Sequence, residues 1–411
     1  MNRRILISAF GLAPNHGSDA EVGWKWVTTL PEFGYDVWVI TREANRQGIE
    51  SELARQGAIS NLHFIYHEHR HFQKLIRGSH LRGYLYYYLW QWGAYRKAFG
   101  IHQKIRFDMV HHVTWVSCRQ PSFMGGLGIP FIFGPLAGGE TAPWRLRAGY
   151  GMRQWVADLF RDFVNFVVRF DPCLRNTFRK ASRIYVTSDQ TLKCLPRPYR
   201  EKARIQLAIG IGWKERGGHS AGVNGRVGDE FRVLYVGRFI GWKGMHLGLR
   251  AFKKILKMFP NARLTMIGRG REETEWRKLA DSLSIMDYIT WVPWVQRKDL
   301  SSFYSSHDVF LYPSLHDSGG LVVLEAMSHG LPVVCLNLGG PGIIVNQTCG
   351  FPVVTRKRSQ GHIVDEIADA LLRLAQDQQL RHRLSKGATE RVMFFGWDTL
   401  VTKIYGDIRG Q

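Results

Sequence analysis

The sequence predicts an α/β protein with two domains, each built around a largely parallel β-sheet. The chain has 411 residues, which is long for a single hydrophobic core. Short apolar runs, such as residues 36–42, 231–238 and 307–313, alternate with longer stretches of helical spacing, an order typical of parallel sheets covered by helices. A Gly-rich segment at residues 214–228 separates the two halves and is typical of a flexible linker.

The composition favours an anionic partner. The formal net charge is +22 and the pI is near 10.0, which suits nucleic acid, an acidic lipid surface or a phosphorylated substrate. The five cysteines have no metal-ligand spacing, which favours reduced core thiols in a cytosol. We expect no signal peptide, because the charged N-terminus passes directly into a strand. We also expect no membrane span, because no window approaches ~18 uninterrupted apolar residues.

The first domain is expected over residues 1–213. Its first strand is predicted at residues 3–10, and a loop then enters a helix whose cap region contains Gly17 and Ser18. The last strand of this domain is expected within residues 203–213.

Two stretches of the first domain break the regular pattern. Residues 63–107 contain eight Lys or Arg against one acidic residue, and residues 144–183 contain nine against three, both interleaved with aromatic residues. Cationic side chains beside aromatic rings suit an interface with anionic lipid headgroups. The alternative is core packing beneath a solvated cationic face, and of the two we favour membrane contact.

The second domain is expected over residues 229–395. Its first strand leads through Gly237, Arg238 and Lys243 to a predicted helix that begins near Met245. Cations beside a helix start suit a phosphate group.

The most informative stretch is residues 312–334. A buried strand ends there, the Ser318–Gly320 segment allows a tight turn, and a helix begins near Leu321. Asp317 precedes the turn, and Glu325 follows about one helical turn into the helix. Amides at a helix start attract phosphate, and carboxylates accept hydrogen bonds from ribose and sugar hydroxyls, so the pattern suits a nucleotide sugar.

This motif resembles the signature of the retaining glycosyltransferases of family 4. Two acidic residues are separated by seven others, and EAMSHGLPVV begins at the second. The sequence VGR, followed by Lys243 and Gly244, resembles the same family. The usual motif begins with Glu, where this chain has Asp317, and usually has an aromatic residue between its glycines, where this chain has Ser-Gly-Gly.

The resemblance implies the GT-B fold, in which two Rossmann-like domains face each other across a cleft. A C-terminal helix over residues 396–411 is expected to cross back to the first domain. The base of the donor is expected near the turn at residues 268–270 and near residues 289–295. The implied donor-binding residues are Gly17, Gly237, Arg238, Lys243, Ser318, Gly319, Gly320, Leu321 and Glu325. The implied catalytic residues are Asp317, Glu325, Arg238, Lys243 and His112.

The resemblance also implies how these residues act. Arg238, Lys243 and the amides of the turn would stabilise the donor diphosphate in place of a metal, and the sequence contains no D-x-D pair. Glu325 would bind the ribose hydroxyls and Asp317 the hydroxyls of the donor sugar. We expect no metal and no cofactor apart from the nucleoside diphosphate sugar, which is a co-substrate.

One histidine is expected near the transferred sugar. Residues 108–112 resemble the family strand that supplies it, which makes His112 the candidate and His111 its buried neighbour. A structural histidine remains the alternative for either residue.

The expected acceptor is a glycan or a lipid-linked saccharide, held mainly by the first domain. We expect an enzyme of the hexosyltransferase type that acts in cell-surface polysaccharide synthesis. It would be cytoplasmic and peripherally attached to the inner face of the cell membrane, with no nucleic-acid partner.

Three other interpretations remain open. A GT-B epimerase or phosphorylase would share the fold and the nucleotide-sugar site. A nucleic-acid-binding protein is suggested by charge alone, since no zinc-finger or RNA-binding signature is present. Finally, Asp317 in place of Glu is compatible with an inactive relative.

Overall fold

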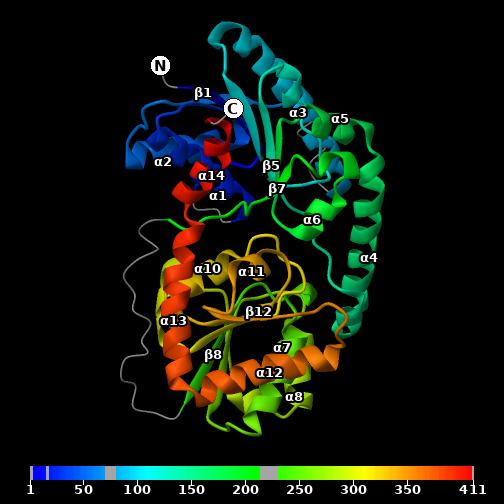
Figure 1. Ribbon diagram of the computed structural model, residues 1–411, viewed down its shortest axis with the longest axis vertical. Coiled ribbons are helices and arrows are strands. Elements are labelled where there is room, and N and C mark those ends of the chain that lie inside the picture. The colour runs from blue at the N-terminus through cyan, green and yellow to red at the C-terminus, as the bar shows by residue number, and fades with distance from the viewer. Residues whose placement is uncertain (1–2, 15–17, 70–79, 213–229, 410–411) are drawn as a thin grey trace. The chain divides into compact units, whose positions relative to one another are not determined.

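A computed structural model describes residues 3–14, 18–69, 80–212 and 230–409, which form two compact units (Figure 1). The first unit comprises Met1–Gly139, Phe163–Ile209 and Trp397–Gln411, and the second comprises Glu140–Asp162 and Gly210–Gly396. The predicted linker at 214–228 lies outside the described residues, and so does Gly17.

The first unit contains a seven-stranded parallel sheet with the order β3-β2-β1-β4-β5-β6-β7. The strands are β1 (Arg4–Ala9), β2 (Asp36–Arg42), β3 (Leu62–His67), β4 (Met109–Thr114), β5 (Phe131–Leu136), β6 (Arg183–Val186) and β7 (Ala203–Ile205). The chain starts in the middle, moves to one edge, and returns to continue on the other side of β1. The strand order therefore reverses between β1 and β4, and this is the topological switch point of the sheet.

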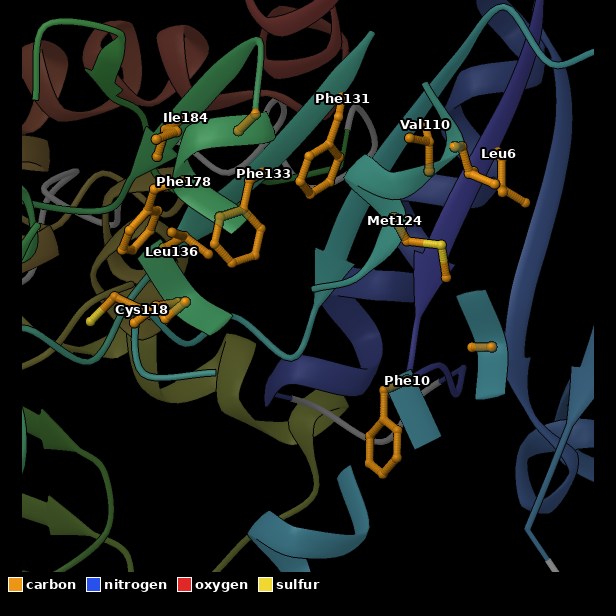
Figure 2. Packing of buried hydrophobic residues seen from close by; sticks show 14 of the residues in the cluster. Leu6, Phe10, Val110, Cys118, Met124, Phe131, Phe133, Leu136, Phe178 and Ile184 are labelled. Atoms are coloured by element: carbon orange, nitrogen blue, oxygen red, sulfur yellow. The ribbon is translucent and has the colours of Figure 1, made fainter. Parts of the chain in front are cut away.

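Helices cover both faces of this sheet. They are α1 (Ser18–Thr29), α2 (Arg46–Gln56), α3 (His80–Ile105), α5 (Pro172–Lys180), α6 (Asp189–Cys194) and α14 (Trp397–Arg409), and α4 (Met152–Val167) ends in this unit. Side chains of β1 alternate between two cores, because successive residues of a strand point to opposite faces. Ile5 and Ile7 join the cluster under α1 and α14, whereas Leu6 joins the cluster under α3 and α5, which Figure 2 shows with Phe133 and Phe178.

The second unit repeats this topology with six parallel strands in the order β10-β9-β8-β11-β12-β13. The strands are β8 (Phe231–Val236), β9 (Ala262–Ile267), β10 (Ile289–Val292), β11 (Val309–Tyr312), β12 (Val333–Leu336) and β13 (Gly350–Val353). The helices are α7 (Met245–Leu256), α8 (Glu273–Ser282), α9 (Leu300–Ser306), α10 (Leu321–Ser328), α11 (Gly339–Ile344), α12 (Gln360–Gln376) and α13 (Gln378–Val392). Strands β11 and β12 are buried along their whole length, which explains their continuous apolar sequence. Here the switch point lies between β8 and β11.

The predicted class, two Rossmann-like α/β domains, is confirmed. The C-terminal helix α14 belongs to the first unit, where the ring of Trp397 lies 6.1 Å from that of Trp26. The phenol of Tyr405 on the same helix bonds to His111 at 2.6 Å. These buried contacts explain why the chain returns to the first unit after α13.

The boundary drawn at residue 213 is corrected for residues 140–162, which belong to the second unit. Within this segment Arg147 donates to Asp162 at 2.8 Å, which ties its two ends together. Its contacts with the rest of the second unit include Asp158, which lies 3.6 Å from His316, and the ring of Tyr150, which lies 6.0 Å from that of His246. These partners are more than 80 residues away in the sequence and carry no local signal, so the boundary could not be predicted.

The aromatic residues of the stretch 63–107 divide between core and surface. Tyr86, Tyr87 and Trp90 are buried in the cluster under α3, whereas Tyr84 and Trp92 are exposed. Core packing therefore explains the first three. None of the helices in the described part of the chain combines the length and the apolar character that crossing a membrane would need.

Candidate active site

The loops after β8 and β11 meet at the switch point of the second sheet. Gly244 ends the first loop with φ at +72°, and a β-carbon there would lie 2.0 Å from the carbonyl oxygen of Pro313. Only glycine allows this approach, and it brings Lys243 against the second loop. The predicted residues Gly237 and Arg238 lie in the first loop, and Ser318 lies in the second, which ends where Leu321 begins α10.

Asp317 is the centre of this arrangement. Its Oδ2 accepts hydrogen bonds from the ammonium of Lys243 and from the hydroxyl of Tyr312, both at 2.5 Å. Its Oδ1 accepts the amides of Gly319 and Gly320 at 3.1 and 3.2 Å. Burial alone would raise the pKa of Asp317, but the charge of Lys243 and these hydrogen bonds lower it to about 2. The carboxylate is therefore ionised, and donors of the chain itself occupy both of its oxygens.

Glu325 lies one turn into α10 and is held from the side of α9. Arg297 donates to its Oε1 at 2.9 Å, and the hydroxyl of Tyr304 donates to its Oε2 at 3.2 Å. Burial raises the pKa of Tyr312 well above its ordinary value, and the nearby phenol of Tyr304 contributes to this rise. The two carboxylates, Asp317 and Glu325, are thus bonded to neighbouring tyrosine hydroxyls.

Arg238 belongs to the same group of charges. The hydroxyl of Tyr235 donates to the carbonyl of Arg238 at 3.1 Å, and its ring stacks on Tyr312 with the centroids 6.3 Å apart. Burial raises the pKa of Tyr235, the charge of Asp317 raises it further, and the charge of Arg238 lowers it. The charges of Asp317 and Arg238 therefore both lie near the buried hydroxyl of Tyr235. Arg238 itself is an exposed residue.

A cavity of about 230 Å³ opens beside Arg238. It is lined by Phe239, Gly268, Arg269, Glu273, Arg277, Trp291, Val292 and Pro293. The guanidinium of Arg277 lies 4.4 Å from the ring of Trp291, and its Nε and Nη2 donate to Glu273. The cavity thus has aromatic walls and a charged rim, at the place where the sequence predicts the base.

The buried ring of His316 and the half-buried ring of Trp242 connect the two loops of the site. The ring of His316 stacks on that of Trp242 with the centroids 4.9 Å apart, and its Nε2 lies 3.6 Å from Oδ1 of Asp158. Burial lowers the pKa of His316, so the imidazole is neutral near pH 7. Trp242 precedes Lys243 and His316 precedes Asp317, so the stacked rings position both members of the ion pair.

The two candidate histidines lie in the core of the first unit, on opposite faces of β4. His111 bonds to Tyr405 on one face, and His112 lies 3.2 Å from the hydroxyl of Tyr87 on the other. Burial lowers the pKa of His111 to about 4 and that of His112 to about 3, so both imidazoles are neutral. His112 is only 1% exposed within the strand, and its catalytic role stays a prediction.

Asp19 marks the switch point of the first sheet. Its Oδ1 accepts the amide of Val116 at 3.3 Å, and its Oδ2 is buried without a hydrogen-bond partner among the described residues. Burial raises the pKa of this carboxyl to about 7, and the bond from Val116 opposes the rise. Thr114 completes the junction, because its hydroxyl donates to the carbonyl of Gly11 at 2.8 Å.

Sequence reasoning missed several residues of these sites. Tyr312 and Tyr235 lie in apolar runs and are indistinguishable there from core residues, and Tyr304 lies in the short helix α9, which carries no motif. Arg297 and Asp158 come from distant segments that carry no motif. In the described part of the chain, no group of three or more His, Cys, Asp and Glu side chains could hold a metal ion.

Two parallel sheets of this order, with a polar site at the switch point of the second, define the GT-B class of protein. HepE of Anabaena, solved with UDP and glucose, shares this fold, with a TM-score of 0.62 over 100% of both chains at 15% identity. Residues 220–391 match the sequence model of the family described as "Glycosyl transferases group 1". The predicted resemblance is thereby confirmed.

Two curated relatives carry the name D-inositol 3-phosphate glycosyltransferase. The protein from Kribbella flavida is 33% identical over 179 residues, which are 41% of either chain. The protein from Streptomyces avermitilis is 31% identical over 330 residues, 74% of this chain and 65% of the relative. In the first of these alignments the chain spans less than half the length of the relative.

Replacing Lys243 with Met should destabilise the protein. The change leaves the carboxylate of Asp317 buried without its cation, which costs about 3 kcal/mol in the free energy of unfolding. The measurement is denaturant unfolding. Lys254→Met is the matched control, because Lys254 pairs with Asp365 at the surface and its loss costs less than about 1 kcal/mol. Adding Asp317→Asn to Lys243→Met should recover part of the loss, and equal stability of the two Lys variants would contradict this account.

Asp19→Asn should change how stability depends on pH. The folded pKa of about 7 exceeds the ordinary 3.8, so the folded state keeps a proton that the unfolded state releases. This contribution is fully present below 3.8 and is lost as pH rises through about 7. The free energy of unfolding of the unmodified protein should fall over this range by up to about 1.4 kcal/mol per pH unit. Melting temperatures from pH 5 to 8 should show a flatter dependence in the variant, and parallel curves would refute the assignment.

Proposed function

We propose that the chain is a retaining glycosyltransferase that uses a nucleoside diphosphate sugar as donor. The acceptor is a glycan or a lipid-linked saccharide at a membrane surface, and the product serves cell-surface polysaccharide synthesis. The observation that carries the proposal is the junction of the β8 and β11 loops, where Lys243 pairs with Asp317 and the residue after Arg238, Phe239, lines a cavity of about 230 Å³. The match to the family model supports the reaction class, and the UDP bound to HepE supports the donor class.

The diphosphate would lie between the cations and the start of α10. The first amides of a helix have no acceptor within it, so those at Leu321 and Val322 can point to phosphate. The guanidinium of Arg238 and the ammonium of Lys243 would stabilise the charge that grows on the departing nucleotide. This charge compensation supports a reaction that needs neither a metal ion nor a cofactor.

Asp317 and Glu325 would orient the donor. Glu325 is the candidate for the ribose hydroxyls, because it lies on the first helical turn beyond the amides. A sugar hydroxyl could reach Asp317 only by replacing one of its present donors at Oδ2, Lys243 or Tyr312. Lys243 would then be released toward the diphosphate, so donor binding would exchange an internal ion pair for a pair with the ligand. Departure and attack on one face of the sugar, assisted by the phosphate, would retain the anomeric configuration.

The first unit would bind the acceptor. Asp19 is the candidate contact there, because its buried Oδ2 can accept a hydrogen bond from, or when protonated donate one to, a saccharide hydroxyl. The net charge of +22 supports work beside an anionic lipid surface, which we place at the inner face of the cell membrane.

The proposal is tested by a thermal-shift screen of nucleoside diphosphate sugars, followed by turnover with the ligand that binds. A donor at 100 times its Kd should stabilise the protein by about 2.7 kcal/mol. Turnover should require a lipid or glycan acceptor, persist with EDTA and retain the anomeric configuration. Conversion of the donor alone would favour an epimerase, and the absence of any shift would refute the proposal.

Arg238→Gln should weaken binding of nucleoside diphosphates by about ten- to 100-fold, because a charge-assisted hydrogen bond to phosphate is lost. The affinity for the corresponding nucleoside should stay unchanged, since it lacks the phosphates. Titration calorimetry measures both. Arg250→Gln, at an exposed position of α7, is the control. An equal loss for nucleoside and diphosphate would show that Arg238 does not bind the phosphates.

Trp291→Ala should weaken binding of the nucleoside itself by about ten-fold, because a wall of the base cavity is removed. Trp294→Ala is a matched control, since Trp294 lies three residues further on and is 69% exposed. Calorimetry with the nucleoside compares the two variants. The same affinity in both would place the base elsewhere.

A further inference from the structure

Helix α4 presents its apolar side chains to solvent. Together with the following 3-10 turn (Val168–Phe170) it exposes large hydrophobic residues at helical spacing. The exposed fraction is 67% for Phe160, 61% for Phe163 and 64% for Phe170. Further members of this outward face are Val156, Leu159 and Phe166. A helix of a globular domain normally turns such a face toward the core. An apolar face that is exposed instead indicates contact with another surface.

The polar side of the same helix points into the protein. Asp158 is buried and accepts from Gln154 at 2.9 Å. Asp162 accepts from the buried Arg147 at 2.8 Å, and the buried Asn165 accepts from Arg119 at 2.7 Å. These bonds determine the orientation of α4. Rotating α4 so that its apolar face pointed inward would break these hydrogen bonds. Losing the partners of buried charged groups costs more free energy than burying the apolar side chains would return.

The exposed charged residues of the stretch that contains α4 are cationic. All three acids of the stretch 144–183 are engaged within the protein, Asp158 and Asp162 as described and Asp171 as the N-cap of α5. The exposed charged residues of the same stretch are Arg145, Arg153, Arg175, Arg179 and Lys180. Exposed phenylalanines with exposed cations complement a surface that is anionic and has an apolar interior.

We infer that the outward face of α4 and its 3-10 turn docks in the plane of an anionic lipid surface. The phenylalanines enter the boundary between headgroups and acyl chains, and the arginines contact the phosphates. The helix lies along the surface, since no described helix could cross it. The lipid surface would be the partner surface of the proposed function. Docking rests on that function only in one respect, namely that the lipid surface would deliver a lipid-linked acceptor.

The test is cosedimentation of the full chain with vesicles of phosphatidylglycerol and phosphatidylcholine, or of phosphatidylcholine alone. Binding should require the anionic lipid. The double variant Phe160→Ser and Phe163→Ser should bind about ten-fold more weakly or less. Replacing both Arg145 and Arg153 with Gln should reduce binding about five-fold per arginine at low salt. The matched control is Phe394→Ser, which removes a 60% exposed phenylalanine from the second unit.

Two outcomes would overturn the inference. Equal binding of the Phe160/Phe163 variant and the control would show that α4 does not contact lipid. A dimer in light scattering that the double variant abolishes, together with no vesicle binding, would assign the face to a second copy of the chain. The nucleotide-sugar thermal shift is measured on the same variants and should not change. If that shift is absent while vesicle binding depends on α4, the proposed function fails and the docking surface stands.

Discussion

The ion pair between Lys243 and Asp317 is the interaction on which the candidate site depends. It joins the loops after β8 and β11, the two strands between which the order of the second sheet reverses. Because the carboxylate also accepts the amides of Gly319 and Gly320, the same charge shapes the turn that begins α10. One internal charge pair therefore sets the position of a cation and the direction of helix amides, which are the two elements that an anionic ligand needs.

The first unit has the same topology, but the pKa of the carboxyl at its switch point is shifted in the opposite direction. Asp19 joins the loop after β1 to the end of β4, as Asp317 joins the loops after β8 and β11. Asp19 has no cation bonded to it among the described residues, and its pKa is raised to about 7, whereas that of Asp317 is lowered to about 2. The switch point of the second sheet therefore combines an ionised carboxylate with a bonded cation, whereas that of the first sheet has a carboxyl whose ionisation is disfavoured by burial.

The sequence was sufficient for the fold and for the two loops that meet at the switch point of the second sheet, because both leave local signals. Buried parallel strands are continuous apolar runs, and tight turns require glycine, as at Gly244 and Gly320. The sequence did not predict which side chains bond to the charged residues of the candidate site. Tyr304 and Arg297 approach Glu325 from another helix and loop, and His112 packs inside a strand instead of ending it. These facts depend on which face a side chain occupies in three dimensions, and one sequence does not specify that.

The segment at residues 140–162 contains most of α4 and also contacts the loops after β8 and β11. Asp158 lies on the inner side of α4 and faces His316, whose ring stacks on Trp242. His316 and Trp242 are the sequence neighbours of Asp317 and Lys243. The inner side of α4 therefore contacts the two loops of the candidate site through Asp158 and His316, and these contacts do not involve a strand of the sheet. The same polar contacts that hold the apolar side chains of α4 outward thus also position the residues beside the ion pair.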